Sequence, residues 1–209
     1  MSDYRFAVRD IISEPYAVAP QLTARLRIEE STGVQVHAIA LRCQVRIEPQ
    51  RRRYDEVSAA ALLGLFGERA RWSDTLKPFT WMHCNATVPG FSGHAEFALA
   101  LPCTYDLDVI GTRYLHALDA GDIPLTFLFS GTIFTRAESG FAVEPVPWAC
   151  EAHFDLPVFV WRQMIESYFP DTGWLRLSSD TLVALAEFRA RHGVTSWDET
   201  IDKLLGDAS

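Results

Sequence analysis

Residues 35–48 read Gln-Val-His-Ala-Ile-Ala-Leu-Arg-Cys-Gln-Val-Arg-Ile-Glu, and this stretch decides the fold. Its apolar and polar residues alternate with a period of two, which is typical of a β-strand with one face in a hydrophobic core and the other in water. The core-facing residues are Ile39, Leu41, Cys43, Val45 and Ile47, and the solvent-facing residues are Arg42, Gln44, Arg46 and Glu48. The sequence therefore predicts a long strand that is buried on one face.

The same period recurs before and after this stretch. Residues 22–28 alternate in the same way, and the turn-forming residues 31–33, Ser-Thr-Gly, separate them from the long strand. This spacing predicts an antiparallel hairpin. Further strands are predicted at the N-terminus around Phe6 and Val8 and over residues 79–88, 94–102, 124–135 and 141–154. Six to seven strands, each with an apolar face to cover, predict two packed antiparallel sheets.

Helical spacing replaces the period of two in other parts of the chain. Residues 55–66 begin with two acids and are followed by Gly67, which predicts an inserted helix. Residues 109–118 fit a helix or a strand, and we favour a helix. After residue 156 helical spacing dominates. We therefore predict an α+β protein with two parts. These are an antiparallel β-sandwich-like core over residues 1–156 and a C-terminal helical tail, packed on that core, over residues 157–209.

The composition limits the classes of protein to which this chain can belong. A chain of 209 residues with 48% hydrophobic content can bury a sizeable core. No window approaches the roughly 18 uninterrupted apolar residues of a membrane span, and the first residues lack the parts of a signal peptide. We therefore expect a cytoplasmic protein without a membrane span. The net charge of −8 repels phosphate, so we expect no nucleic-acid partner.

A concentration of arginines follows the long strand. Five of the nineteen basic residues fall within residues 42–54, and three of them form the run Arg51, Arg52 and Arg53. Guanidinium groups form paired hydrogen bonds with carboxylates, so the run has two interpretations. It pairs with the nearby acids Glu48, Asp55 and Glu56 and holds a turn together, or it binds an acidic partner.

Two tryptophans extend the second interpretation. Trp72 and Trp148 fall at predicted element ends, where aromatic rings often mark contact surfaces, although large rings more often pack in a core. The candidate partner-binding residues are therefore Arg46, Arg51, Arg52, Arg53, Trp72 and Trp148.

The cysteines and histidines suggest a second kind of site. Cys84, Cys103, Cys150 and His153 carry soft and imidazole ligands of the kind that zinc or nickel selects, and they form the candidate metal site. Their spacing is unfavourable, because residues three apart on a strand, such as Cys150 and His153, point to opposite faces. No C-x-x-C pair occurs, and free buried thiols are the simpler interpretation. We predict no cofactor.

Catalytic motifs do not occur in the sequence. It has no G-x-S-x-G elbow, no phosphate-binding G-x-x-x-x-G-K-[ST] loop and no G-x-G-x-x-G after a strand. Asp106 and Asp108 are two residues apart and could form paired carboxylates, but two acids alone are common on a solvated face. The sequence therefore favours a protein that is not an enzyme.

Several strings spread over nearly the whole chain resemble an uncharacterised bacterial domain family. They are Arg46-Ile-Glu-Pro-Gln-Arg-Arg-Arg-Tyr54, Leu65-Phe66-Gly67, Pro102-Cys103-Thr104-Tyr105-Asp106, Phe129-Ser130-Gly131-Thr132-Ile133-Phe134 and Pro147-Trp148. Genes of that family are often found near those of uptake nickel–iron hydrogenases. The resemblance implies an accessory role in maturation, assembly or electron delivery, with a hydrogenase subunit as the partner, and it implies no catalytic residues.

A second, shorter resemblance lies at the N-terminus. Phe6-Ala-Val-Arg-Asp-Ile-Ile and Glu14-Pro-Tyr-Ala-Val-Ala-Pro20 are similar to the first strand of the export chaperone SecB. We therefore expect a non-enzymatic accessory or assembly protein that binds another protein. The alternatives are a metal-binding protein, a chaperone-like peptide-binding domain and a β domain with an apolar ligand between its sheets. The sequence leaves the oligomeric state open, and a homo-oligomer is compatible with it.

Overall fold

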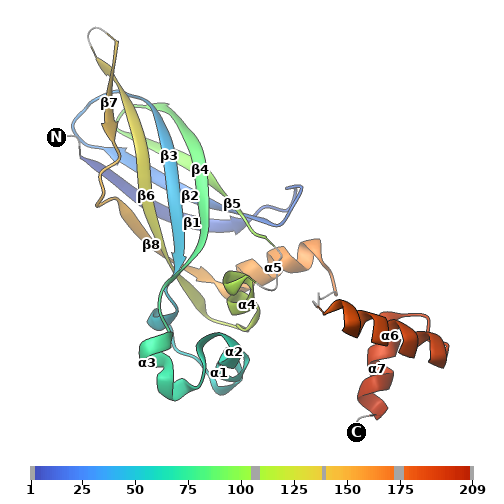
Figure 1. Ribbon diagram of the computed structural model, residues 1–209. Helices are drawn as coiled ribbons and strands as arrows, with labels where there is room; N and C mark the ends of the chain where they lie inside the picture. Colours follow the sequence, from blue (N-terminus) through green and yellow to red (C-terminus); the bar gives the residue numbers. More distant parts are fainter. Residues whose placement is uncertain (1–2, 105–108, 138–139, 172–176, 208–209) are drawn as a thin grey trace. The chain divides into compact units, whose positions relative to one another are not determined.

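The computed structural model describes residues 3–104, 109–137, 140–171 and 177–207 of the chain (Figure 1). Its strands form two antiparallel sheets. The first sheet has the order β1 (Tyr4–Ser13), β2 (Gln21–Glu30) and β5 (His94–Pro102). The second has the order β4 (Phe79–Phe91), β3 (Val36–Ile47), β6 (Asp122–Ala137) and β7 (Gly140–Pro145), and β8 (Glu151–Pro157) also pairs with β6. The predicted α+β, sandwich-like fold is confirmed.

The core lies between the two sheets and is filled by the alternating faces of their strands. All five core-facing residues predicted for the long strand are buried in β3. Phe6 of β1 stacks on Phe129 of β6 with ring centroids 4.7 Å apart, so side chains of the two sheets meet directly. β3 pairs with β4 on one edge and with β6 on the other, which makes it a central strand of its sheet.

The predicted hairpin between residues 22–28 and the long strand is wrong. β2 pairs with β1 and β5, whereas β3 belongs to the other sheet. The side chain of Glu30 explains the change of direction. Its buried carboxylate accepts hydrogen bonds from the backbone N–H groups of Thr32 and Gly33, at 2.8 and 2.9 Å, and from the Thr32 hydroxyl. These bonds hold a turn that leads the chain into the second sheet.

The predicted strand over residues 141–154 is two strands in the structure. β7 and β8 both pair with β6, and residues 146–150 separate them. Pro145 and Pro147 have no backbone N–H to donate, so a continuous ladder along β6 cannot form through them. This split raises the strand number to eight in the described part of the chain.

Short helices lie beyond the end of β3 (Figure 1). They are the 3₁₀ turn η1 (Pro49–Arg51), α1 (Glu56–Ala61), α2 (Leu63–Phe66), η2 (Arg69–Arg71), α3 (Trp72–Thr75) and α4 (Ile110–His116). The inserted helix predicted near residues 55–66 is therefore divided into α1 and α2, and residues 110–116 form a helix as favoured. Asp55 caps α1 by accepting the N–H of Ser58 at 2.7 Å.

The chain forms two compact units, Met1–Thr172 and Gly173–Ser209. Helix α5 (Val158–Tyr168) belongs to the first unit with the sheets, because its residues Val158, Trp161 and Met164 are buried there. This division lies later than the change of sequence pattern at residue 156.

The second unit contains α6 (Ser179–His192) and α7 (Trp197–Asp207), joined by the guanidinium of Arg189 lying 4.1 Å from the ring centroid of Trp197. Packing of these two helices on the core stays a prediction. None of the described helices has the length and hydrophobicity needed to cross a membrane.

Two glycines with similar φ angles make it possible to compare the steric and the conformational cost of adding a side chain. Gly131 in β6 has φ 130°, and a Cβ built on it would lie 2.0 Å from the carbonyl oxygen of Ala40 in β3. Gly140 in β7 has φ 134°, and no described atom lies within 4 Å of its Cβ position. We expect Gly140→Ala to lower the free energy of unfolding by about 1–3 kcal/mol through its positive φ. We expect Gly131→Ala to cost at least about 3 kcal/mol, because it also pushes two paired strands apart.

Urea denaturation of both variants, followed by tryptophan fluorescence, measures the difference. Equal losses in the two variants would show that the close approach of β6 to Ala40 does not matter.

Candidate functional site

The candidate site lies on the outer face of the larger sheet, around the end of β3. We call it the arginine face and define it by Arg46, Arg51, Arg53, Thr126 and His153. The register of the sheet aligns Arg46 of β3 with Thr126 of β6, and Thr126 with His153 of β8. The Thr126 hydroxyl lies 3.0 Å from His153 Nδ1, and Arg51 Nη1 lies 3.4 Å from the same nitrogen. Three strands and the turn η1 thus bring one contiguous surface together.

Arg52, in the middle of the arginine run, has a structural role. Its Nη1 and Nη2 donate to the backbone carbonyls of Asp122 and Ala120, at 3.1 and 2.9 Å. Its guanidinium also lies 5.1 Å from the ring centroid of Tyr54. Because both terminal nitrogens are engaged by the backbone, Arg52 ties the turn after β3 to the loop before β6. The predicted turn-holding role is therefore found for this arginine.

The neighbouring acids do not pair with the arginine run in the described part of the chain. Glu48 is largely buried, accepts a hydrogen bond from Gln50 at 2.7 Å, and lies 4.0 Å from Arg46 Nε. Asp55 caps α1, and its hydrogen bonds from Ser58 hold its carboxyl pKa below the ordinary value. Glu56 pairs with Arg69 at 2.9 Å.

The predicted ion pairs of Glu48, Asp55 and Glu56 with the arginine run are therefore not found among the described residues, because Gln50, Ser58 and Arg69 bind these carboxylates. The charge of Arg52 acts on Asp55 only as a smaller contribution to its lowered pKa. Arg51 and Arg53 are exposed, and neither forms an ion pair with any residue that the structure describes.

The arginine run also borders a shallow pocket of about 320 Å³. All three arginines of the run line it, together with Asp122 and Asp155. The three guanidiniums outnumber the two carboxylates, and one guanidinium, that of Arg52, is held by backbone carbonyls. The pocket is thus a mixed-charge recess in which Arg51 and Arg53 keep donors available for an incoming carboxylate.

The structure separates the two candidate tryptophans from each other. Trp72 is half-buried, donates from Nε1 to the carbonyl of Gly67 at 3.1 Å, and meets Tyr54 edge to face at 5.1 Å. It therefore packs the helices beyond β3. Trp148 is 96% exposed and lies in the segment between β7 and β8. No described contact joins either ring to Arg51 or Arg53, so the structure gathers the arginines without the tryptophans.

The three cysteines of the candidate metal site are buried, whereas His153 is exposed. Cys84 of β4 faces Cys43 of β3 in the core. Cys103 donates its thiol to the carbonyl of Leu101 at 3.4 Å, and Cys150 donates to that of Tyr4 at 3.6 Å.

His153 is on the outer face with Arg51, because β8 alternates, whereas Cys150 is buried in the segment before β8 begins. Among residues 3–104, 109–137, 140–171 and 177–207, no three His, Cys, Asp or Glu side chains are grouped to hold a metal ion. The metal hypothesis stays a prediction without geometric support. The candidate pair Asp106 and Asp108 lies outside the described residues.

Sequence reasoning missed the position of His153 on the arginine face. The period of two within β8 does place Glu151, His153 and Asp155 on one face, and this signal was present. The pairing of β8 with β6, which brings that face next to Arg46 and Arg51, is a long-range contact that no local pattern encodes.

The fold and the site define an α+β protein whose β-sandwich-like core carries an arginine-bearing outer face. Residues 1–209 match a family of unknown function (DUF6084), and the chain belongs to that family. The curated proteins contain no match to it.

Solved structures show only remote likeness. Sporulation control protein Spo0M from Bacillus subtilis is 12% identical, with 74% of this chain and 48% of that chain covered and a TM-score of 0.30. A β-glucosidase from Kluyveromyces marxianus is 7% identical, with 74% and 15% covered and a TM-score of 0.25. β-Glucosidase 3B from Thermotoga neapolitana is 12% identical, with 74% and 17% covered and a TM-score of 0.27. This chain thus spans less than half of each of these structures, and TM-scores this low say nothing about its function.

The different roles of the three consecutive arginines can be measured. We expect Arg52→Gln to lower the free energy of unfolding by about 1–3 kcal/mol, because it removes charged donors from the carbonyls of Ala120 and Asp122. We expect Arg51→Gln and Arg53→Gln to stay within about 0.5 kcal/mol of the wild type, as surface substitutions usually do. Thermal and urea denaturation of the three matched variants make the comparison, and a similar loss in all three would refute the assigned roles.

The buried thiols predict a loss of stability at alkaline pH. Burial raises the pKa of Cys84 to about 11, whereas an unfolded cysteine titrates near about 8.5. A group whose pKa is raised by folding stabilises fully below its unfolded pKa, and this stabilisation is lost as the pH rises toward the folded pKa. Between about pH 9 and 11, Cys84 should thus contribute a decrease of about 1.4 kcal/mol per pH unit to the free energy of unfolding.

Cys84→Ala should remove that contribution from the slope, whatever it does to stability at neutral pH. Urea titrations at several pH values provide the slopes of variant and wild type. Parallel slopes would mean that Cys84 ionises as freely in the folded protein as in the unfolded chain.

Proposed function

We propose that this protein is a non-enzymatic accessory protein that binds an acidic segment of a protein partner through the arginine face. One observation carries the proposal. In a chain of net charge −8, Arg51 and Arg53 are exposed and have no ion-pair partner within the described ranges, because the acids close to them in sequence bind other groups. Exposed guanidiniums that intramolecular carboxylates leave unpaired are suited to binding carboxylates of another molecule.

The local structure holds these arginines in place before a partner arrives. Pro49 begins η1 and is buried, and its carbonyl accepts the hydroxyl of Tyr54 at 2.7 Å. Between these two residues, Arg52 is anchored to the loop before β6. The backbone of Arg51 and Arg53 is therefore fixed on both sides. A fixed backbone lowers the conformational entropy that binding would cost, which supports the arginine face as a docking surface.

The charges around the site favour a protein partner over a nucleic acid. Asp122 and Asp155 line the same pocket as the arginine run and would repel a polyphosphate chain. A short acidic segment of a protein can place one carboxylate on Arg51 and another on Arg53 while avoiding both aspartates. The nickel–iron hydrogenase link rests on the family resemblance alone, and it makes a hydrogenase subunit in the cytoplasm the first partner to test.

The experiment compares two double variants that change the net charge equally. Arg51→Gln with Arg53→Gln alters the arginine face, whereas Arg9→Gln with Arg25→Gln alters exposed arginines of β1 and β2. Tagged protein from its native cells is used to identify bound proteins, and each is then purified and rebound, starting with hydrogenase subunits. We expect the first double variant to weaken binding at least about tenfold, the effect of losing about 1.4 kcal/mol of charge-assisted hydrogen bonding.

The control double variant should bind within about twofold of the wild type, and added salt should weaken binding because exposed charges are screened. The proposal fails if the identified partner binds the two double variants equally well. It also fails if no rebinding partner presents an acidic segment to this surface.

A further inference from the structure

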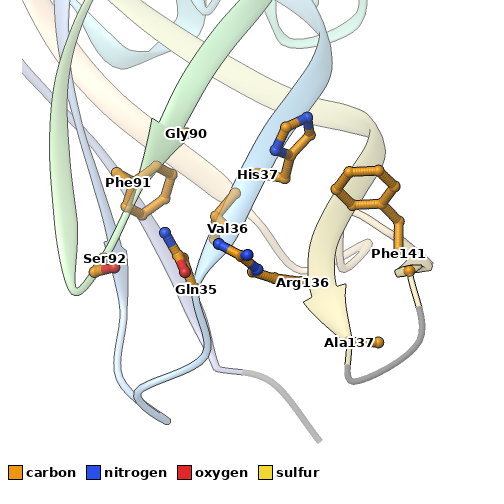
Figure 2. Close-up of a pocket in the computed structure, with 10 residues that line it drawn as sticks. Gln35, Val36, His37, Gly90, Phe91, Ser92, Arg136, Ala137 and Phe141 are labelled. Carbon is orange, nitrogen blue, oxygen red and sulfur yellow. The ribbon is translucent and has the colours of Figure 1, made fainter.

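A second recess lies at the opposite end of β3 from the arginine face (Figure 2). It has a volume of about 620 Å³, within the range of small-molecule sites. Its lining comes from the start of β3 and the residue before it, the end of β4, the turn after β4, the end of β6 and the start of β7. It includes Gln35, His37, Phe91, Ser92, Arg136 and Phe141. Because β3 separates it from Arg51 and Arg53, this strand-end pocket is distinct from the proposed docking surface.

The backbone explains why a recess forms here. β3 begins at Val36 opposite Thr135, so Arg136 and Ala137 of β6 extend past the start of β3 and form one wall. On the other side, a Cβ at Gly90 would lie 2.7 Å from the carbonyl oxygen of His37, so β4 approaches β3 closely without a side chain between them. The end of β6 and the close approach of β4 to β3 therefore shape a pocket at the edge of the sheet.

Two phenylalanines line the pocket, and one of them, Phe141, has an exposed ring. Figure 2 shows Phe91 and Phe141 on opposite sides, with Val36, His37 and Arg136 between them. Phe141 is 60% exposed, and its ring centroid lies 4.4 Å from that of His37. Phe91 is half-buried against the core. When a planar apolar group covers an aromatic ring that is in contact with water, the burial of apolar surface stabilises the complex.

Charge in the pocket is positive and localised. Arg136 is exposed and forms no ion pair with any residue of the described ranges. Its backbone N–H donates to the carbonyl of Gln35 at 3.0 Å, which fixes the base of the side chain at the rim. Gln35 and Ser92 add an amide and a hydroxyl to the lining. One guanidinium with neutral donors around it matches one carboxylate better than a multiply charged phosphate.

We propose that the strand-end pocket binds a small aromatic carboxylate. The aromatic ring of the ligand packs against the exposed ring of Phe141, and its carboxylate accepts hydrogen bonds from the guanidinium of Arg136, which is paired with Phe141 across β6 and β7. This binding is independent of the arginine face, since the two sites share no residue. A ligand of this class needs no opening of the core, because the pocket is open at the edge of the sheet.

Phenylacetate is the probe, and the neutral isostere phenylacetamide is its matched control ligand. Two-dimensional ¹H–¹⁵N NMR of the full chain follows the backbone amides during titration. We expect saturable shifts at Gln35, His37, Ser92 and Arg136, and at least about tenfold weaker binding of phenylacetamide, as loss of a charge-assisted interaction requires. Arg136→Gln should weaken phenylacetate binding about as much and leave phenylacetamide binding unchanged, and Phe141→Ala should weaken both ligands.

Arg25→Gln is the control for net charge, since Arg25 is exposed on β2 and does not line the pocket. It should bind phenylacetate like the wild type, and the same spectra show that each variant is folded. The proposal is overturned if phenylacetate causes no saturable shifts or shifts amides elsewhere. Equal binding of the acid and the amide, or equal effects of Arg136→Gln and Arg25→Gln, would overturn it as well.

Discussion

The two-sided pairing of β3 is the constraint on which the rest of the structure depends. β4 pairs with one edge of β3 and β6 with the other, and from Ile39 to Ile47 the residues of β3 alternate between the core and the outer face. A shift of register by one residue would place Arg42 and Arg46 in the core, and burying their charges would cost several kcal/mol. The core-facing alternation therefore also determines that Arg46 lies on the outer face, where β6 and β8 bring Thr126 and His153 beside it.

The turn after β3 depends on buried hydrogen bonds as much as on charge. The hydroxyl of Tyr54 lies 2.7 Å from both the carbonyl of Pro49 and the hydroxyl of Tyr114. Burial raises the pKa of both tyrosines above the ordinary value, so their hydroxyls stay protonated and keep this network at physiological pH. Tyr114 also meets Phe66 and Phe79 edge to face. The helices beyond β3 thus act as a packed support for the turn that carries Arg51 and Arg53.

Local patterns in the sequence predict those features that depend on neighbouring residues, namely strand faces and helix ends. The alternation in residues 35–48 indicated the buried and exposed faces of β3, and the acidic start and glycine stop around residues 55–66 indicated the helical insertion. The false hairpin shows where this reasoning ends, because the pairing partner of β2 depends on the turn held by the buried carboxylate of Glu30. For the same reason, an acid that is close in sequence does not predict the partner of an arginine. Asp55 caps a helix, Glu56 pairs with Arg69, and His153, which contacts Arg51, comes from a strand about a hundred residues later.

The three consecutive arginines have different roles because their side chains meet different groups around the turn after β3. Arg52 lies toward the loop before β6 and meets backbone carbonyls, which accept hydrogen bonds without neutralising its charge. Arg51 and Arg53, on either side, line the same pocket as Asp122 and Asp155 but form no ion pair with any residue that the structure describes. The turn thus retains three positive charges at one end of an acidic protein while depending on only one of them for its structure. A surface whose charges can be altered without altering the turn can change its partner while the fold stays the same.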